Sequence, residues 1–397
     1  MSEAALSRVS AVRLSPVNVA RATGLVCGHV IVELRTDDGL SGIGEMSDFQ
    51  HLPRFHVDVA ELERTLDALL RGLDVEAANE AARRLEAAFP SAGHLYDKAA
   101  VIKCGVDIAL WDLRGKRQGR SVSDLLGGPV RSSLAVAYPI FRQQRAADVE
   151  ANLELLAARL DQGFSLFRVY VGRHLELDET FLRSARARFG DRLRIKSLDF
   201  SNLLDAVDAA RFVERTRELD YELVEAPARE RDAAGLAFVR RRTLMAVSEH
   251  VYDGAWALEL VAARAVDVLN VGLFALGGIT PARRVAAIAE AAGLRCLIGT
   301  TQELSIGTAA AAHFGAATES ASVACDPVGP LLYTGDVVER PVEYRDGRLV
   351  VPQGPGLGVA LDPERLAAAA GPLRWDTAGA DTATVEAVID RVGGRTS

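Results

Sequence analysis

The chain has 397 residues, a length typical of two domains or of one large barrel with additions. Its hydrophobic content of 49% suffices for a packed core, and its net charge of −8 without a basic stripe argues against a nucleic-acid partner. The first residues lack the pattern of a secretory signal, and no apolar run reaches the length of a membrane span. We therefore expect a cytoplasmic protein that binds neither nucleic acid nor a membrane.

The numbers and positions of the lysines and cysteines limit the kinds of catalytic and metal site that the chain can form. The chain has only four lysines, so a mechanism that needs a lysine base has few candidates. The cysteines are scattered without metal-binding spacing and are expected to be buried thiols in a reducing compartment: Cys27, Cys104, Cys296 and Cys325.

The first part of the chain reads as a sheet followed by helices. Residues 9–46 hold a strand, a loop over 20–27 and a hairpin that turns at Asp37-Asp38-Gly39. A second loop covers 47–56. Helical periodicity then dominates three segments, 57–73, 75–89 and 99–118. This order predicts a small α+β domain over residues 1–132.

From residue 133 onward, short apolar runs alternate with helical patterns. Parallel strands need crossovers of this length, so the alternation predicts a (β/α) barrel over residues 133–330. A doubly wound open sheet gives the same alternation and stays an alternative. The runs are centred near Val136, Val169, Lys196, Leu223, Ala246, Leu269, Leu297 and Val323.

The end of the chain returns to a hairpin pattern. Residues 342–351 alternate around the turn at Asp346-Gly347, and a glycine-rich loop and a helical tail follow. Because a lone hairpin is marginally stable, we expect residues 331–397 to rejoin the N-terminal sheet.

Three carboxylates follow short apolar runs at regular spacing. Asp199 and Glu225 are 26 residues apart, and Glu225 and Glu249 are 24 apart, about one strand-plus-helix unit. In a parallel barrel all three would project from the C-terminal ends of neighbouring strands, where barrels place their chemistry. Converging carboxylates need a cation, and all-oxygen ligation favours Mg²⁺. The alternative is that each is a helix N-cap.

Several short motifs together give the chain a family resemblance. They lie at 37–45, 107–116, 125–128, 225–227, 277–280, 299–303 and 355–358. It resembles the enolase superfamily, in its mandelate racemase / muconate lactonizing enzyme branch, over nearly its whole length. The resemblance implies a modified (β/α)₇β barrel under an α+β capping domain built from both termini, capping loops at 20–27 and 47–56 that close over the substrate, and a homo-oligomer.

The resemblance also implies a chemistry. Asp199, Glu225 and Glu249 occupy the three magnesium-ligand positions, although Asp199-Phe-Ser201 replaces the usual Asp-x-Asn. A substrate carboxylate bound to Mg²⁺ would lose its α-proton to a nearby base, and the metal would stabilise the enediolate.

The acid/base positions depart from the family pattern. The usual Lys-x-Lys of the second barrel strand reads Arg168-Val-Tyr170. The base expected on the opposite wall falls on Gly272, and residues 299–303 contain no histidine. Neither usual set is present, so Tyr170 becomes the candidate base, because the guanidinium of Arg168 favours the phenolate and lowers its pKa; the alternative is a pocket wall.

Other candidates surround Tyr170. Arg168 keeps its charge and suits a carboxylate clamp, and Glu303 is a substrate contact, an acid or a cap. His250 adjoins a predicted ligand, but strand neighbours face opposite ways, so a buried or capping histidine is the alternative. The same alternation places Lys196 on the opposite pleat from Asp199. On the second loop, His51 and His56 could supply a proton or be solvated.

These features favour a Mg²⁺-dependent dehydratase that acts on a small carboxylate, a sugar acid or hydroxy acid. One base suffices for β-elimination, whereas racemisation needs groups on both faces of the substrate. Two alternatives remain: a racemase, epimerase or cycloisomerase that uses lid-loop groups, and a metal-binding paralogue without catalytic activity.

Overall fold

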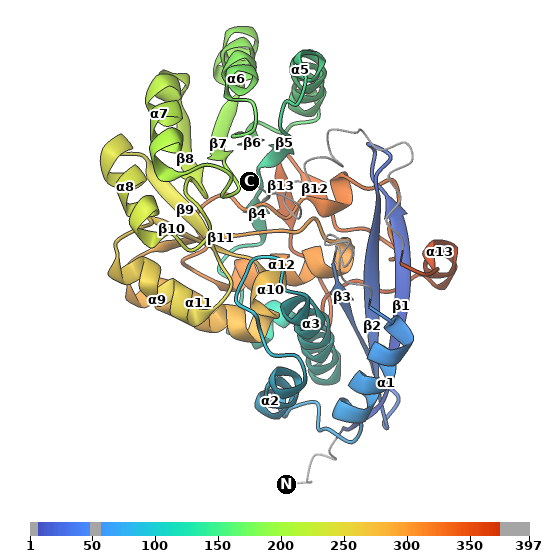
Figure 1. Cartoon of the computed structure of the whole chain (residues 1–397). Coiled ribbons are helices and arrows are strands. Elements are labelled where there is room, and N and C mark those ends of the chain that lie inside the picture. The colour runs from blue at the N-terminus through green and yellow to red at the C-terminus, as the bar shows by residue number, and fades with distance from the viewer. Residues whose placement is uncertain (1–6, 48–56, 374–397) are drawn as a thin grey trace.

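The structure, a computed structural model, describes residues 7–47 and 57–373. It contains a curled parallel sheet surrounded by helices, and beside it an antiparallel sheet covered by helices (Figure 1). These parts are the predicted barrel and capping domain. The candidate residues His51 and His56 and most of the second expected loop lie outside the described residues.

The barrel strands are consecutive along the chain and parallel to their neighbours. Each apolar run named above, from Val169 to Leu297, lies in one of them. The strands are β5 (Tyr138–Ile140), β6 (Leu166–Tyr170), β7 (Arg194–Asp199), β8 (Tyr221–Glu225), β9 (Ala246–Val251), β10 (Val268–Val271) and β11 (Arg295–Ile298).

An extended segment, residues 320–326, joins the two edges of this sheet. On one side the backbone N–H of Cys296 donates to the carbonyl of Ser320, and the N–H of Asp326 donates to Ile298. On the other side, Cys325 forms a parallel bridge with Val136. The segment takes the eighth position that the periodicity predicts, so the barrel is confirmed and the open-sheet alternative is wrong.

Helices cover the outside of the barrel, and acidic caps fix where several of them begin. The side chains of Asp205, Asp232 and Asp253 accept backbone N–H groups of α7, α8 and α9. The barrel helices are α5 (Ala146–Asp161), α6 (Leu175–Phe189), α7 (Ala206–Thr216), α8 (Ala233–Thr243), α9 (Gly254–Ala262), α10 (Leu273–Leu276), α11 (Ile279–Ala291) and α12 (Ser305–Ala317), with 3₁₀ turns η1 (Gly190–Arg192), η2 (Arg217–Leu219) and η3 (Gly329–Leu331).

The capping domain contains the expected sheet and helices, but its first loop is shorter than predicted. Pairing continues to Ala20 opposite Val26, which leaves only residues 21–25 as the connection. The elements are β1 (Val9–Ala20), β2 (Val26–Thr36), β3 (Ser41–Met46), α1 (Val59–Leu70), α2 (Ala78–Ala88), α3 (Lys98–Gln118) and α4 (Val122–Leu125).

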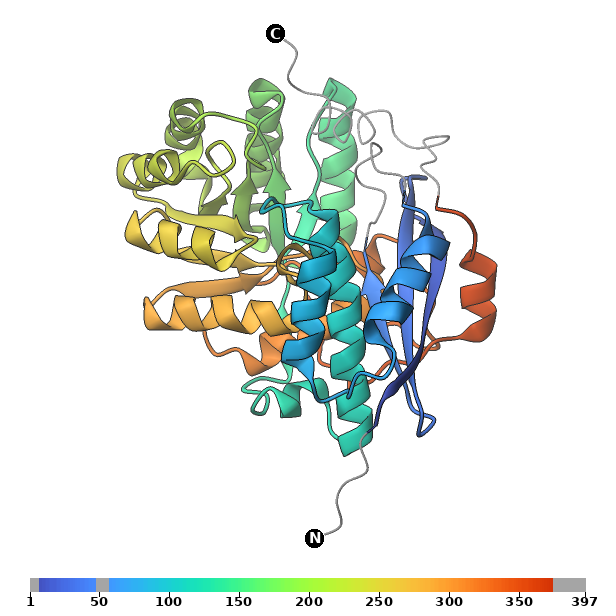
Figure 2. The same cartoon turned by 60° about the horizontal axis from the view of Figure 1, so that its bottom comes forward.

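The final segment contacts both parts of the molecule. Its hairpin, β12 (Tyr344–Arg345) and β13 (Arg348–Val350), pairs with β4 (Ser133–Ala135) at the start of the barrel rather than with the N-terminal sheet. Helix α13 (Pro363–Ala369) does rejoin that sheet and packs outside β1 (Figure 2). The domain boundaries at 132/133 and 330/331 stay predictions.

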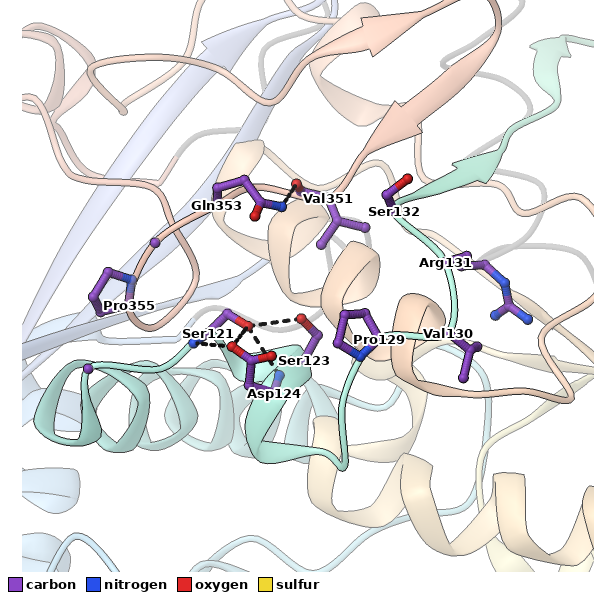
Figure 3. Close-up of a pocket in the computed structure, with 12 residues that line it drawn as sticks. Ser121, Ser123, Asp124, Pro129, Val130, Arg131, Ser132, Val351, Gln353 and Pro355 are labelled. Atoms are coloured by element: carbon purple, nitrogen blue, oxygen red, sulfur yellow. Dashed lines mark hydrogen bonds between the residues drawn. The ribbon is translucent and has the colours of Figure 1, made fainter.

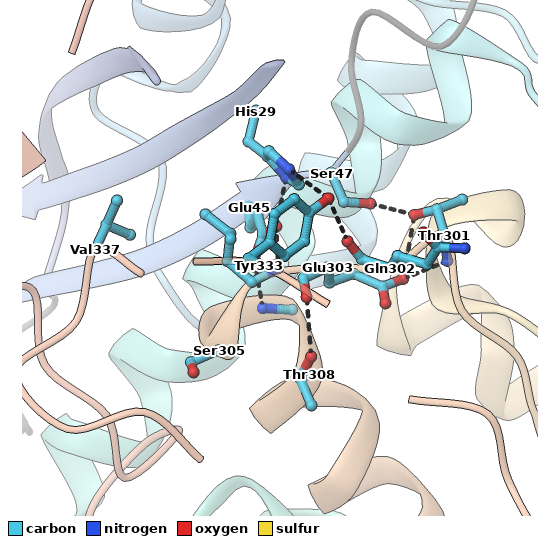
Figure 4. A network of polar contacts seen from close by, with 12 residues as sticks. His29, Glu45, Ser47, Thr301, Gln302, Glu303, Ser305, Thr308, Tyr333 and Val337 are labelled. Atoms are coloured by element: carbon cyan, nitrogen blue, oxygen red, sulfur yellow. Dashed lines mark hydrogen bonds and ion pairs between the residues drawn. The ribbon is translucent and has the colours of Figure 1, made fainter. Parts of the chain in front are cut away.

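A buried carboxylate ties the capping domain to the barrel (Figure 4). Glu45, near the end of β3, accepts the backbone N–H groups of Leu304 and Gly307, each at 2.8 Å, at the start of α12. The ring of His29 links Glu45, at 2.9 Å, to the hydroxyl of Tyr333, at 3.0 Å. A negative charge is favourable at a helix N-terminus, so this contact holds the capping domain over the barrel.

Within the described residues, no helix combines the length and apolar character needed to cross a membrane. All four cysteines are free and buried, as the sequence predicts.

Two glycines let β3 lie directly on α3. A Cβ at Gly44 would lie 1.9 Å from the carbonyl oxygen of Gly105, and a Cβ at Gly42 would lie 2.4 Å from that of Ala109. Both neighbours are backbone atoms, which cannot rotate away. The glycines of the hairpin motif are therefore required for sheet–helix packing.

We predict that Gly44→Ala lowers the free energy of unfolding by about 1–3 kcal/mol, because the methyl group overpacks the interface. Urea unfolding followed by circular dichroism would measure it. Gly335→Ala is the matched control, since the atom nearest its Cβ, in Val19, is 4.0 Å away. Equal midpoints for the two variants would contradict the prediction.

Candidate active site

A guanidinium group lies among three carboxylates inside the barrel. The Nη1 atom of Arg168, on β6, is 3.1 Å from Asp326 Oδ2 and 3.6 Å from Glu225 Oε1. The same nitrogen is 4.0 Å from Asp199 Oδ2. None of these side chains is more than 2% exposed. We call these four residues the Arg168 cluster.

A second cation adjoins the Arg168 cluster. The Nζ atom of Lys196 is 2.6 Å from Asp326 Oδ1 and 3.8 Å from Glu225 Oε2. The predicted placement of Lys196 on the opposite pleat is therefore wrong. The register between β6 and β7 shifts beside Arg168, which pairs with Ser197. Lys196 is the extra residue at this shift, so the regular alternation of side chains is broken.

Two further side chains complete the surroundings of Glu225. His250 Nε2 is 3.3 Å from Glu225 Oε1, and Asn270 donates from Nδ2 to the same oxygen at 3.0 Å. Burial lowers the pKa of His250, but its hydrogen bond to Glu225 and the negative charges of the nearby carboxylates together outweigh burial and raise the pKa overall. Burial also disfavours charge on Glu225, yet Lys196 and the other cations hold the pKa of its carboxyl below the ordinary value.

Glu249, the third predicted ligand, faces away from this cluster. In the register of β8 and β9, Ser248 lies opposite Glu225, so Glu249 is on the other pleat. Its carboxylate accepts the backbone N–H of His250 at 2.8 Å and the side-chain amide of Asn202 at 3.1 Å. Burial raises the pKa of Glu249 to about 7.

Tyr170 borders the Arg168 cluster at the end of β6. Its ring stacks on Phe141 with centroids 5.5 Å apart. The guanidinium carbons of Arg168 and Arg142 lie 4.7 and 5.1 Å from the ring centroid. Arg142 also donates to the hydroxyl of Ser201 at 2.6 Å, which in turn donates to Asp199 at 2.8 Å. Two cations therefore adjoin one phenol.

Left-handed residues other than glycine follow three of the barrel strands. Ser201 and Asn202 have φ of 48° and 58° after β7, Ala226 has 50° after β8, and Gln302 has 71° in the loop after β11. Such conformations cost about 1–3 kcal/mol each and cluster at functional sites. Asp220, Leu244 and Arg264 are also left-handed and precede β8, β9 and β10 at the opposite face, so the candidate face is instead identified by the carboxylates that end β7 and β8.

Glu303 lies on that face, in the loop after β11 (Figure 4). Its carboxylate accepts the backbone N–H of Thr301 at 3.0 Å and the hydroxyl of Thr300. The hydroxyl groups of Thr301 and Ser47 are 2.5 Å apart, which connects this loop to β3. Burial raises the pKa of Glu303. Its contacts are to its own loop, and it lines a small pocket there with Glu45 and Phe274.

Gly272, where the sequence places the missing base, follows β10 as the N-cap of α10. A Cβ there would lie 2.6 Å from the ring of Phe274. Leu273 and Phe274, at the start of α10, are both buried.

A larger pocket lies far from the strand ends, between α4 and the final hairpin (Figure 3). Ser121, Ser123 and Asp124 line it and hydrogen-bond to one another in the cap of α4. Their polar groups are used in holding the helix start, so this pocket is not the candidate site.

Comparison with protein families identifies the chain. Residues 3–127 match the family described as mandelate racemase / muconate lactonizing enzyme, N-terminal domain, and residues 152–365 match the one described as enolase C-terminal domain-like. The chain belongs to the mandelate racemase / muconate lactonizing enzyme family of the enolase superfamily.

Similar members of this family are cycloisomerases. The chain is 32% identical over 346 residues to a chloromuconate cycloisomerase of Cupriavidus necator, covering 85% of this chain and 90% of that protein. It is 31% identical to muconate cycloisomerase 1 of Pseudomonas putida, covering 85% and 89%. The solved muconate cycloisomerase of Pseudomonas fluorescens superimposes with a TM-score of 0.81 at 28% identity, covering 92% and 99%.

Enzymes of this family generally use a divalent metal, and the present side chains do not fit one. In the described ranges, no three histidine, cysteine or acidic side chains are arranged to hold a metal ion. Glu249 faces away, and Arg168 lies beside the other two predicted ligands. A dication about 4 Å from a guanidinium would be repelled by roughly 8 kcal/mol at an effective dielectric constant of about 20.

Sequence reasoning missed three participants: Arg142, Asn270 and Asp326. Asp326 had the same signal as the predicted ligands, because it follows the last apolar run, at Val323. Arg142 and Asn270 carried no such signal, since only the folded barrel brings them to the cluster.

Asp178, on α6, holds the chain that follows Tyr170. Its carboxyl accepts the backbone N–H of Gly172 at 2.8 Å, and burial raises its pKa to about 7. Between the ordinary carboxyl pKa of about 4 and this value, the folded state holds a proton that the unfolded state has lost. Stability contributed by this group is therefore lost as the pH rises through that window.

We predict that Asp178→Asn removes part of this pH dependence. Relative to the wild type, the free energy of unfolding of the variant rises by up to about 4 kcal/mol at pH 8 and is unchanged below pH 4, because the folded-state pKa of Asp178 is about 7. Urea unfolding at both pH values would measure it. The matched control is Asp208→Asn, whose side chain is 50% exposed. If the free energy of unfolding changes with pH by the same amount in the wild type and in Asp178→Asn, the prediction is contradicted.

Proposed function

We propose that this protein is a cycloisomerase that closes a ring within a small unsaturated carboxylate. The observation that carries the proposal is the likeness to muconate and chloromuconate cycloisomerases along most of both chains. This likeness favours the cycloisomerase alternative over the dehydration that the sequence puts first. The proposed substrate class is a dicarboxylate with a conjugated double bond.

A site with a proton donor on only one wall suits this reaction. A carboxylate oxygen of the substrate adds to one carbon of a double bond, a C–O bond forms, and the neighbouring carbon takes one proton. A single proton donor suffices, whereas racemisation needs groups on both faces. Tyr170 with its two arginines lies on one wall, and Leu273 and Phe274 form an apolar wall opposite.

Each polar group has a proposed role. The Tyr170 hydroxyl donates the proton to carbon and is reprotonated from solvent. Arg168 and Arg142, beside its ring, stabilise the transient phenolate. Arg142 is only half-buried, and we assign it the substrate carboxylate, which its planar fork suits.

His250 and Glu303 stay candidates for substrate contact or proton transfer. No step is assigned to Mg²⁺, because Arg168 lies between the predicted ligands. Localisation in the cytoplasm and a homo-oligomeric state also remain predictions.

The test of the function is a substrate screen in deuterated water. We expect muconate, a chloromuconate or another unsaturated dicarboxylate to lose its conjugated absorbance and to yield a lactone with one deuterium on carbon, detected by NMR. Hydroxy acids and sugar acids in the same screen test dehydration. If no acid is converted and none exchanges deuterium, the cycloisomerase proposal fails and the non-catalytic alternative replaces it.

We predict that Tyr170→Phe lowers kcat by about 10²–10⁴-fold with little change in KM, because the variant keeps the ring but loses the proton donor. Steady-state kinetics on the substrate found in the screen would measure it. Tyr221→Phe is the control, since that hydroxyl contacts Thr216 on the outer side of the barrel. Unchanged turnover in Tyr170→Phe would remove Tyr170 from the mechanism.

A further inference from the structure

We propose that the guanidinium of Arg168 occupies the place of a divalent cation, so that this protein folds and holds its carboxylates without a metal ion. The proposal concerns how the charges are compensated. It holds or fails independently of the reaction proposed above.

The geometry of the Arg168 cluster is that of a cation site. Its three carboxylates come from three different segments: Asp199 ends β7, Glu225 ends β8, and Asp326 lies in the segment that closes the barrel. One nitrogen of Arg168 reaches an oxygen of each within 4.0 Å. A single buried positive group thus bridges carboxylates that would otherwise repel one another.

The charges nearly balance without an added ion. Asp199, Glu225 and Asp326 supply three negative charges, and Arg168 and Lys196 supply two positive charges. His250 and Asn270 direct polar N–H groups at Glu225 as well. A dication placed here would change the net charge of this buried cluster from −1 to +1, which brings it no closer to neutrality and adds repulsion from Arg168 and Lys196.

Glu249, the third predicted ligand, makes its hydrogen bonds outside the Arg168 cluster. Glu249 lies on the other pleat of β9, and Asn202 and the backbone N–H of His250 satisfy it. To bring Glu249 to the cluster, β9 would have to shift its register by one residue. That shift would move Ser248 and His250 off the interior face.

Metal binding by the wild type is the first measurement. After dialysis against EDTA, the protein is titrated with Mn²⁺ to about 1 mM and free Mn²⁺ is followed by EPR. We expect no stoichiometric binding and the same melting temperature in EDTA as in about 10 mM Mg²⁺. One Mn²⁺ bound per chain and displaced by Mg²⁺ would overturn the proposal.

The Arg168→Met variant is the second measurement, since it removes the charge and keeps an apolar side chain. We expect it to melt at a lower temperature than the wild type in EDTA, to recover with Mg²⁺, and to bind Mn²⁺ about 100-fold or more tighter than the wild type. An unchanged melting temperature in EDTA, or a loss that Mg²⁺ does not restore, would contradict the proposal.

Two control variants keep these outcomes separable. Arg168→Lys retains one positive charge and should fold without metal and bind no Mn²⁺. Arg183→Met removes an arginine whose side chain is 45% exposed, and should change neither the melting temperature nor Mn²⁺ binding. If Arg168→Met does not fold in EDTA, refolding with and without Mg²⁺ decides: recovery only with Mg²⁺ supports the proposal, and no recovery overturns it.

Discussion

The interaction on which the rest of the site depends is the buried contact of Arg168 with three carboxylates. Removing one partner of such a cluster leaves an uncompensated charge in an apolar interior, which costs several kcal/mol. The strand ends that carry Asp199, Glu225 and Asp326 are therefore held at fixed separations by a group of the chain itself. The same arrangement positions Tyr170, because its ring lies against the guanidinium of Arg168.

The capping domain depends on a separate electrostatic contact. Glu45 joins β3 to the start of α12, and the glycines before it allow β3 to approach α3 closely. The same loop region carries Glu303, so the position of that carboxyl is set by the contact between the two parts of the molecule. Fold and site are thus connected through a few buried polar groups rather than through the large apolar core alone.

The sequence predicted the barrel well because strand and helix periods are local properties that need no knowledge of packing. The predicted metal site stays a prediction, and it assumed regular strands. The register shift beside Arg168 brings Lys196 inside, and the pairing of Glu225 with Ser248 turns Glu249 outward. Neither the position of Lys196 nor that of Glu249 can be predicted from residue spacing, since both depend on which backbone hydrogen bonds form between neighbouring strands.

The placement of Asp326 has a consequence for how the chain assembles. This residue lies in the last extended segment of the barrel, residues 320–326, yet it is the contact nearest to Arg168 and to Lys196. Until that segment docks, Arg168 and Lys196 lack the carboxylate that lies nearest to each of them. Closure of the barrel therefore forms the shortest ion pairs of Arg168 and of Lys196 in the same step, which favours cooperative folding of the barrel.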